Sequence, residues 1–237
     1  MSSEQLASAV NTLDGNLGGS WNILSGMSGL HRPDLGIARL NNASLAYSLR
    51  DIGAKGGAVV RVRRDTGGGA GDDDEQDFTA LEVSNGTLEA FVGAGNDGFV
   101  RTWYSQTLGG VDAFNVNANS QPKLVDNGTI FSDGIDFSNG LLFAATTGDF
   151  FPISQPITVF MVSKVDTTVP AAGYFSDSNS FTSLIFYANA SSSAILTGDG
   201  ATTQISKGSI NTNQAYYTLL ANGANSEIRE NGTSVAT

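Results

Sequence analysis

Short runs of alternating apolar and polar residues, separated by turn dipeptides, fill the chain after about residue 42. The run at 58–64, Ala-Val-Val-Arg-Val-Arg-Arg, alternates valine with arginine, which is the two-residue period of a strand with one basic side. Asn-Gly or Asp-Gly pairs, which tolerate the positive φ angles of tight hairpin turns, begin at Asn85, Asp97, Asn127, Asp133, Asn139, Asp199, Asn222 and Asn231. Further strand candidates lie at 129–131, 141–145, 157–165, 181–188, 194–197, 216–220 and 227–229. The pattern predicts an all-β fold, an antiparallel sandwich, with short helical turns only at 44–50 and 87–92.

The first 41 residues follow a different pattern. Leu6, Val10 and Leu13 have roughly helical spacing, and the stretch after them is rich in Gly and Ser but contains Trp21 and Ile23. Such a segment is a poor independent core, yet it is too apolar to be a mere spacer. We therefore expect residues 1–41 to be an arm that docks on another protein through these five side chains. Residues 42–237 would then form one sandwich. A simple flexible tail is the alternative for the first segment.

Composition narrows the function classes. The formal net charge of −11 argues against nucleic acid as a partner, because phosphate binding needs clustered Lys and Arg. The chain has no cysteine, which excludes a thiolate site, and His31 is its single histidine. A catalytic triad with histidine or a metal bound by several histidines is therefore not expected. We expect no cofactor and no bound metal. The apolar runs have strand length, so no membrane span is expected, and the N-terminus shows no secretory signal, which predicts synthesis in the cytoplasm.

The stretch at 98–106, Gly-Phe-Val-Arg-Thr-Trp-Tyr-Ser-Gln, is the most informative strand of the chain. Trp103 and Tyr104 are neighbours, so in a strand their rings point to opposite faces. One ring should enter a core while the other can meet a partner or a second layer. The two aromatics could stack on a sugar ring, or both could serve packing, and Gln106 is a polar neighbour in either case. Trp103, Tyr104 and Gln106 are thus the candidate residues for contact with a glycan or a partner.

Several segments in this order resemble one family. They are 46–50 (Ala-Tyr-Ser-Leu-Arg), 60–64 (Val-Arg-Val-Arg-Arg), 77–78 (Asp-Phe), 90–93 (Ala-Phe-Val-Gly), 98–106 and 121–124 (Gln-Pro-Lys-Leu). Together they resemble a concanavalin A-like, laminin G-type jelly roll found in bacteriophage and bacterial surface proteins. The same segments are similar to the first half of the catalytic domain of arabinofuranosidase B-type glycosidases. The resemblance covers roughly residues 44–237 and is strongest over 46–125, while 227–235 looks like the late hairpin of these sandwiches.

The chain departs from the pattern of that family in two places. The family usually has Trp-Tyr-Asp-Gln followed by a glycine-rich turn, whereas this chain has Ser105 in place of the acid and Thr-Leu-Gly-Gly at 107–110. A carboxylate that organises the turn, or holds a calcium ion or a sugar, is therefore expected to be missing. Jelly rolls of this type also continue with further strands after the late hairpin. We expect those strands either to be lacking or to be supplied by another segment, since the sheet edge would otherwise be exposed.

Acidic residues are the remaining candidates for chemistry. Glycoside hydrolysis needs two carboxyl groups flanking the scissile bond, and the chain offers Asp112, Asp126, Asp133, Asp136 and Asp149. None lies in a segment that matches the catalytic carboxylates of the arabinofuranosidase family, and turn or solvent-facing roles fit them better. The run of acids at 72–75, with the nearby acid at 77, could hold calcium. Its spacing favours a solvated loop, and the same run could form ion pairs with the arginines at 61–64.

The resemblance, supported by the missing secretory signal, the unmatched catalytic carboxylates and the arm, implies a non-enzymatic bacteriophage virion protein, associated with a tail or fibre. It would be a structural and adhesion module that binds other virion subunits as a homo-oligomer, with a cell-surface glycan as a further candidate ligand. A glycoside hydrolase of arabinofuranosidase type is the alternative from another class, and a free carbohydrate-binding lectin is the third. Two converging carboxylates near Trp103 would favour the hydrolase, whereas an arm buried against other chains would favour the structural role.

Overall fold

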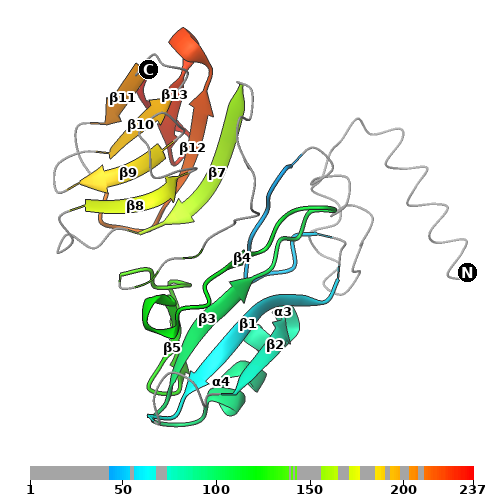
Figure 1. Cartoon of the computed structure of the whole chain (residues 1–237). Coiled ribbons are helices and arrows are strands. Elements are labelled where there is room, and N and C mark those ends of the chain that lie inside the picture. The colour runs from blue at the N-terminus through cyan, green and yellow to red at the C-terminus, as the bar shows by residue number, and fades with distance from the viewer. Residues whose placement is uncertain are drawn as a thin grey trace, which may run out of the picture.

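The computed structural model describes residues 43–53, 56–67, 74–138, 140, 142, 156–164, 171–176, 185–189, 193–197, 203–207 and 211–237. In these residues the architecture is all-β and antiparallel, as predicted, with two short helices. The strands form three sheets, and Figure 1 shows the first sheet with its helices in one part of the molecule and the other two sheets in another. None of the described helices has the length and apolarity needed to cross a bilayer.

The first sheet contains the segment of strongest resemblance. Its strand order is β2 (Glu75–Thr79), β1 (Ala58–Asp65), β3 (Asp97–Trp103), β5 (Lys123–Asp126) and β6 (Thr129–Ile130), and β4 (Ala113–Phe114) also pairs with β3. Alternation along β1 places Val60 and Val62 on one face, where both are fully buried. The other face carries Arg61 and Arg63, so the predicted strand with one basic side is confirmed, whereas the Arg64 guanidinium lies over the Phe91 ring at 5.3 Å.

Two helices cover the apolar face of the first sheet. α3 (Ala80–Ser84) begins at Thr79, whose hydroxyl accepts the Glu82 N–H while the Glu82 carboxylate accepts the Thr79 N–H, a reciprocal capping box. α4 (Thr87–Val92) buries Leu88 and Val92 against the valines of β1 and β3. The helical turn predicted at 87–92 is therefore confirmed, whereas α3 was not predicted.

The second and third sheets pack on each other. The second has the order β14 (Thr233–Ala236), β13 (Glu227–Glu230), β12 (Ala215–Ala221) and β7 (Ile157–Ser163). The third has the order β11 (Thr203–Lys207), β10 (Ser193–Thr197), β9 (Ile185–Asn189) and β8 (Ala171–Ser176). Ile205 of β11 lies in one buried cluster with Tyr217, Leu219 and Ile228 of the second sheet. These two sheets thus share a core that contains different residues from the core of the first sheet.

The helical turn predicted at 44–50 is wrong. Residues 43–53 form no helix or strand and instead run along the end of β3, a segment that we call the strap. The backbone carbonyls of Ser48 and Arg50 accept hydrogen bonds from the side chain of Gln106, at 2.9 and 2.8 Å. Because a distant side chain satisfies these carbonyls, the local hydrogen bonds of a helix are not needed there.

Candidate functional site

The two aromatic residues at the end of β3 point to different surroundings, as their adjacency predicts. Trp103 packs against the core of the first sheet, with the Tyr47 ring of the strap at 5.5 Å and the Phe137 ring at 6.4 Å between centroids. Its indole Nε1 is buried and has no hydrogen-bond partner within the described part of the chain. The Trp103 ring therefore serves packing, and it fixes the strap and the loop at 137 to the end of β3.

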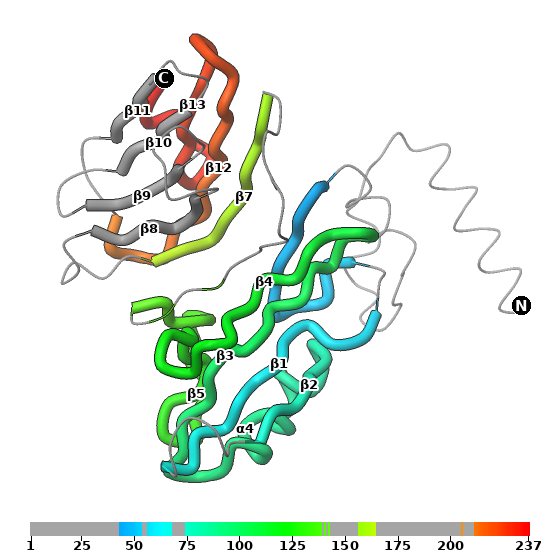
Figure 2. The backbone as a smooth tube through the Cα atoms, viewed as in Figure 1, coloured from blue at the N-terminus to red at the C-terminus, as the bar shows by residue number. Residues whose placement is uncertain are grey.

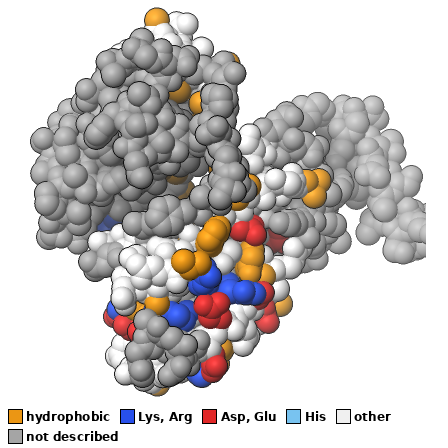
Figure 3. All heavy atoms as spheres, viewed as in Figure 1, with side chains coloured by type: hydrophobic (Ala, Val, Ile, Leu, Met, Phe, Trp, Pro, Cys, Tyr) orange, Lys and Arg blue, Asp and Glu red, His pale blue; other side chains and the backbone are white. Residues whose placement is uncertain are grey.

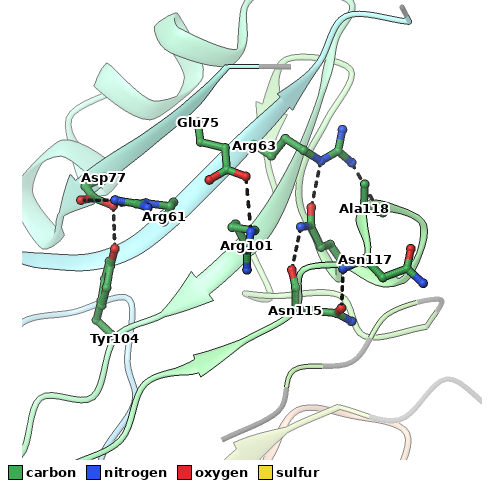
Figure 4. A network of polar contacts seen from close by, with 10 residues as sticks. Arg61, Arg63, Glu75, Asp77, Arg101, Tyr104, Asn115, Asn117 and Ala118 are labelled. Atoms are coloured by element: carbon green, nitrogen blue, oxygen red, sulfur yellow. Dashed lines mark hydrogen bonds and ion pairs between the residues drawn. The ribbon is translucent and has the colours of Figure 1, made fainter. Parts of the chain in front are cut away.

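Tyr104 lies with charged residues on the other face of the sheet. Its hydroxyl donates to Asp77 Oδ1 at 2.8 Å, and the Arg61 guanidinium donates to both oxygens of the same carboxylate, at 2.7 and 3.0 Å. Burial, together with the hydrogen bond to Asp77, raises the pKa of Tyr104 to about 12. The hydrogen bonds from Arg61 in turn lower the pKa of Asp77. Figure 4 shows the three side chains meeting across β2, β1 and the end of β3.

A second set of contacts continues along the same face. Arg101 Nε lies 3.4 Å from Glu75 Oε1, and the buried Arg63 donates to Gln121 Oε1 at 2.9 Å (Figure 4). The Phe99 ring lies beneath the Arg63 guanidinium at 4.9 Å and the Lys123 ammonium at 5.7 Å. Figure 3 shows acidic and basic side chains interspersed over this part of the molecule. We call this surface, which carries Arg61, Arg63, Glu75, Asp77, Phe99, Arg101 and Tyr104, the charged face.

The charged face confirms the interpretation that the acidic run pairs with the arginines of β1. Arg61 pairs with Asp77 and Arg64 with Asp74, while Arg63 approaches Asp65 at 3.8 Å. The register of β1 and β2 places Arg61 directly opposite Asp77. The sequence contains a signal for this arrangement: Arg61 and Arg63 are two residues apart, and so are Glu75 and Asp77, so that paired strands can bring opposite charges to the same face. Residues 68–73, which include the first acids of the run, lie outside the described residues.

Gln106 is a buried residue whose side chain holds the strap. Its Oε1 accepts the N–H groups of Ile52 and Gly53 at 2.8 and 3.2 Å, and its Nε2 donates to the carbonyls of Ser48 and Arg50. All the hydrogen-bonding capacity of one carboxamide is thus used within the chain. The sequence predicted Gln106 as a polar neighbour of the two aromatics, and in the structure its carboxamide is bound to the strap.

A carboxylate from further along the chain contacts the turn after β3. The Ser105 N–H donates to Asp112 Oδ1 at 2.9 Å, so Asp112 reaches the turn where the family pattern has its acid at position 105. The Ser105 and Thr107 hydroxyls lie 3.0 Å apart, and Gly110 lies so close that a Cβ there would be 2.0 Å from Thr107 Oγ1. Position 105 thus lacks a carboxylate, as the departure from the family pattern predicts, and Asp112, seven residues further along the chain, binds the turn through its own carboxylate.

The acidic residues considered for hydrolysis take part in local structure wherever they are described. Asp112 binds the Ser105 turn and Asp126 pairs with Lys123 at 2.9 Å. Asp133 pairs with Lys164 at 2.7 Å. The Asp136 carboxylate accepts hydrogen bonds from the N–H and the hydroxyl of Ser138. Asp149 lies outside the described residues. The predicted turn roles of Asp133 and Asp136 are confirmed.

A shallow groove lies beside the strap at the start of β1. It has a volume of about 320 Å³ and is lined by Asp51, Ala58, Thr79, Leu81 and Gln106, with the glycines at 56–57. The groove is mainly backbone and small side chains. Among the described residues, no three His, Cys, Asp or Glu side chains group closely enough to hold a metal ion. The predicted arm residues, Leu6, Val10, Leu13, Trp21 and Ile23, lie outside the described residues.

Comparison of the chain with protein-family models, with curated proteins and with solved structures finds no match.

Proposed function

We propose that this protein is a structural and adhesion module of a bacteriophage virion, associated with a tail or fibre. The virion assignment rests on the resemblance of residues 46–125 to the concanavalin A-like jelly rolls of bacteriophage and bacterial surface proteins. An all-β, antiparallel fold is compatible with that resemblance. In the same proposal, residues 42–237 form one jelly roll of this type and residues 1–41 form an arm that docks on a neighbouring subunit.

The observation that carries the structural role is the internal use of polar side chains at 98–106. Gln106 makes four hydrogen bonds to the strap, and Tyr104, Asp77 and Arg61 bind one another. A hydrolase needs one carboxyl group that gives or takes a proton and a second that acts as nucleophile or base. The described acids near this segment are instead held by backbone N–H groups or cations, which is the arrangement of a scaffold.

A glycan is the ligand that we propose for the charged face. Tyr104, Arg61 and Asp77 present an aromatic ring, a guanidinium and a carboxylate side by side, which are groups that contact sugar rings and hydroxyls. The side chains of Arg61 and Asp77 are 41% and 44% exposed, so they can reach a ligand without opening the fold. A Tyr104→Ala variant should lose binding to bacterial surface polysaccharide in a calorimetric titration, whereas Leu108→Ala should bind as the unsubstituted chain does.

The assembly role is tested through the arm. Replacing Trp21 and Ile23 by Asp removes the apolar contacts that would hold the arm on a neighbour, and Asn22→Asp is the matched control because it adds charge while keeping both apolar side chains. Sedimentation of the full chain should show that the double variant has lost the higher oligomers that the control retains. Equal masses for all three chains, or release of sugar from arabinan, would contradict the proposal.

A further inference from the structure

The strand β7 forms one edge of the second sheet (Figures 1 and 2). All seven of its residues pair with β12 in one continuous register, from Ile157 opposite Ala221 to Ser163 opposite Ala215, without a bulge. Among the residues that the structure describes, no strand pairs with the other edge of β7. A regular edge strand presents a row of N–H and C=O groups on which another strand can form.

The side chains of β7 are those of a central strand. Ile157, Val159 and Met161 point inward and pack against the core of the second sheet. On the outer face Phe160 is 78% and Val162 67% exposed. Strands with apolar residues on both faces are typical of positions covered on both sides. Protected edges usually carry a charge, a proline or a bulge, and Ile157–Ser163 has none of these.

The apolar surface extends from β7 to the neighbouring strand. Tyr216 of β12 lies directly opposite Val162 and is 49% exposed, so three large apolar side chains lie together on one outer face. The first sheet shows the usual alternative, because its edge strand β2 carries the charged side chains of Glu75 and Asp77. No charged side chain of β7 opposes pairing in this way.

We propose that β7 pairs with β7 of a second copy of this chain, antiparallel and around a two-fold axis at Phe160. Phe160 is the middle residue of the strand, so the axis places Phe160 opposite its own copy. The same register places Val162 opposite Thr158 and Val159 opposite Met161, so that inward-facing residues meet inward-facing ones. No charged residue lies in the paired stretch, and the two second sheets join into one continuous sheet.

This inference goes beyond the proposed function and does not depend on it. The arm would hold the chain in a larger particle, whereas β7 pairing predicts a two-fold dimer of the chain in any role. The occupant is a second copy because the strand is uncharged and regular, and because this register sets Phe160 against its own copy on the outer face and Val159 against Met161 on the inner face.

Cysteine cross-linking tests the pairing, since the chain contains no cysteine of its own. Residues directly opposite in an antiparallel pair have Cα atoms about 4.5 to 5.5 Å apart, which is within the reach of a disulfide. A Phe160→Cys chain should therefore form a covalent dimer under mild oxidation, read on a denaturing gel without reductant. Thr218→Cys is the matched control, because it lies on the same face one strand further in, opposite Phe160. Its two copies would be three strand spacings apart, about 14 Å.

The register gives a second, independent readout. Val162→Cys alone should not cross-link, because its two copies would be four residues apart along the strands, about 14 Å. The double variant Thr158→Cys and Val162→Cys should cross-link, because position 158 of each copy would lie directly opposite position 162 of the other copy. We expect at least tenfold more covalent dimer for Phe160→Cys than for Thr218→Cys. Equal yields for these two variants, or efficient cross-linking of Val162→Cys alone, would overturn the proposal.

Sedimentation of the unsubstituted chain completes the test. The 24.6 kDa chain should be present as a dimer or a multiple of it at micromolar concentration. Phe160→Lys places two like charges at the two-fold axis and should abolish that dimer. Leu108→Lys, at an equally exposed apolar residue of 76% exposure in the first part of the chain, should leave it intact. If Phe160→Lys leaves the dimer intact while the arm variant loses its higher oligomers, β7 pairing is refuted and the proposed function still stands.

Discussion

Replacing Gln106 is the perturbation that tests the strap most sharply. The Gln106 carboxamide makes two hydrogen bonds as acceptor, from Ile52 and Gly53, and two as donor, to Ser48 and Arg50. A hydrogen bond of this kind contributes about 0.5 to 1.5 kcal/mol net to stability. Since Ile52 and Arg50 lie at the surface, water can replace part of the loss. We expect Gln106→Ala to lower the free energy of unfolding by about 3 kcal/mol.

The assay combines urea unfolding with amide hydrogen exchange. Unfolding followed by far-ultraviolet circular dichroism gives the loss of stability, and exchange of the Ile52 and Gly53 amides reports whether the strap has detached. Gln76→Ala is the control, because Gln76 is an exposed glutamine of β2 and its loss should cost less than about 0.5 kcal/mol. Unchanged protection of both amides, with a stability loss no greater than that of the control, would refute the binding of the strap by Gln106.

The isosteric change Gln106→Glu separates the donors from the acceptors. The carboxylate still accepts the N–H groups of Ile52 and Gly53, but it donates nothing to the carbonyls of Ser48 and Arg50. Burial and the facing carbonyls raise the folded-state pKa of the introduced carboxyl above its ordinary value of about 4.3. Its destabilising effect is therefore absent below the ordinary pKa, grows as the pH rises from that value to the folded-state pKa, and is constant above it. We expect the variant to approach the unsubstituted stability at pH 4 and to fall behind at pH 7. A loss that does not depend on pH would contradict this reasoning.

The remaining predictions concern the charged face and the turn after β3. Asp77→Asn should lower the pKa of Tyr104 from about 12 toward its ordinary value, as an absorbance titration of the phenolate would show; an unchanged titration would contradict the contact. The same change should cost less than about 1 kcal/mol, because Arg61 and Asp77 are both well exposed. Since Arg61 lowers the pKa of Asp77, that stabilisation is present above the ordinary pKa and is lost as the pH falls through the lowered value, so the variant should show a weaker acid dependence. Gly110→Ala should cost about 2 kcal/mol in urea unfolding, because its Cβ would collide with the Ser105 and Thr107 hydroxyl groups, and a loss equal to that of Leu108→Ala would show that the turn is looser than described.

The sequence predicted the strands that carry a strong local signal. The valine and arginine alternation of β1 and the aromatic run of β3 each fit a pleated surface with one buried face, and both strands are present. The opposite faces of Trp103 and Tyr104 also followed from the two-residue period alone. The strand β2 was missed because its first residues, Glu75, Gln76 and Asp77, belong to a composition that local propensity assigns to loops.

The parts that could not be predicted depend on contacts between distant residues. The strap fails to form a helix because Gln106, more than fifty residues away, binds its carbonyls. The carboxylate at the Ser105 turn comes from Asp112, and no local sequence pattern predicts that contact. Likewise, β7 was predicted as a strand from its apolar run, but its edge position follows only from the sheet order. Local periodicity identified strands such as β1, β3, β7 and β12, whereas the polar contacts that define the candidate site required the three-dimensional arrangement.

Electron microscopy of the full chain tests the central proposal, that this is an assembling virion module, most directly. The account predicts ordered multi-subunit particles in which residues 1–41 of each chain contact a neighbouring subunit. Substitution of Trp21 and Ile23 by Asp should disperse those particles, and Asn22→Asp should not. An isolated monomer with residues 1–41 packed on its own sheets would contradict the account.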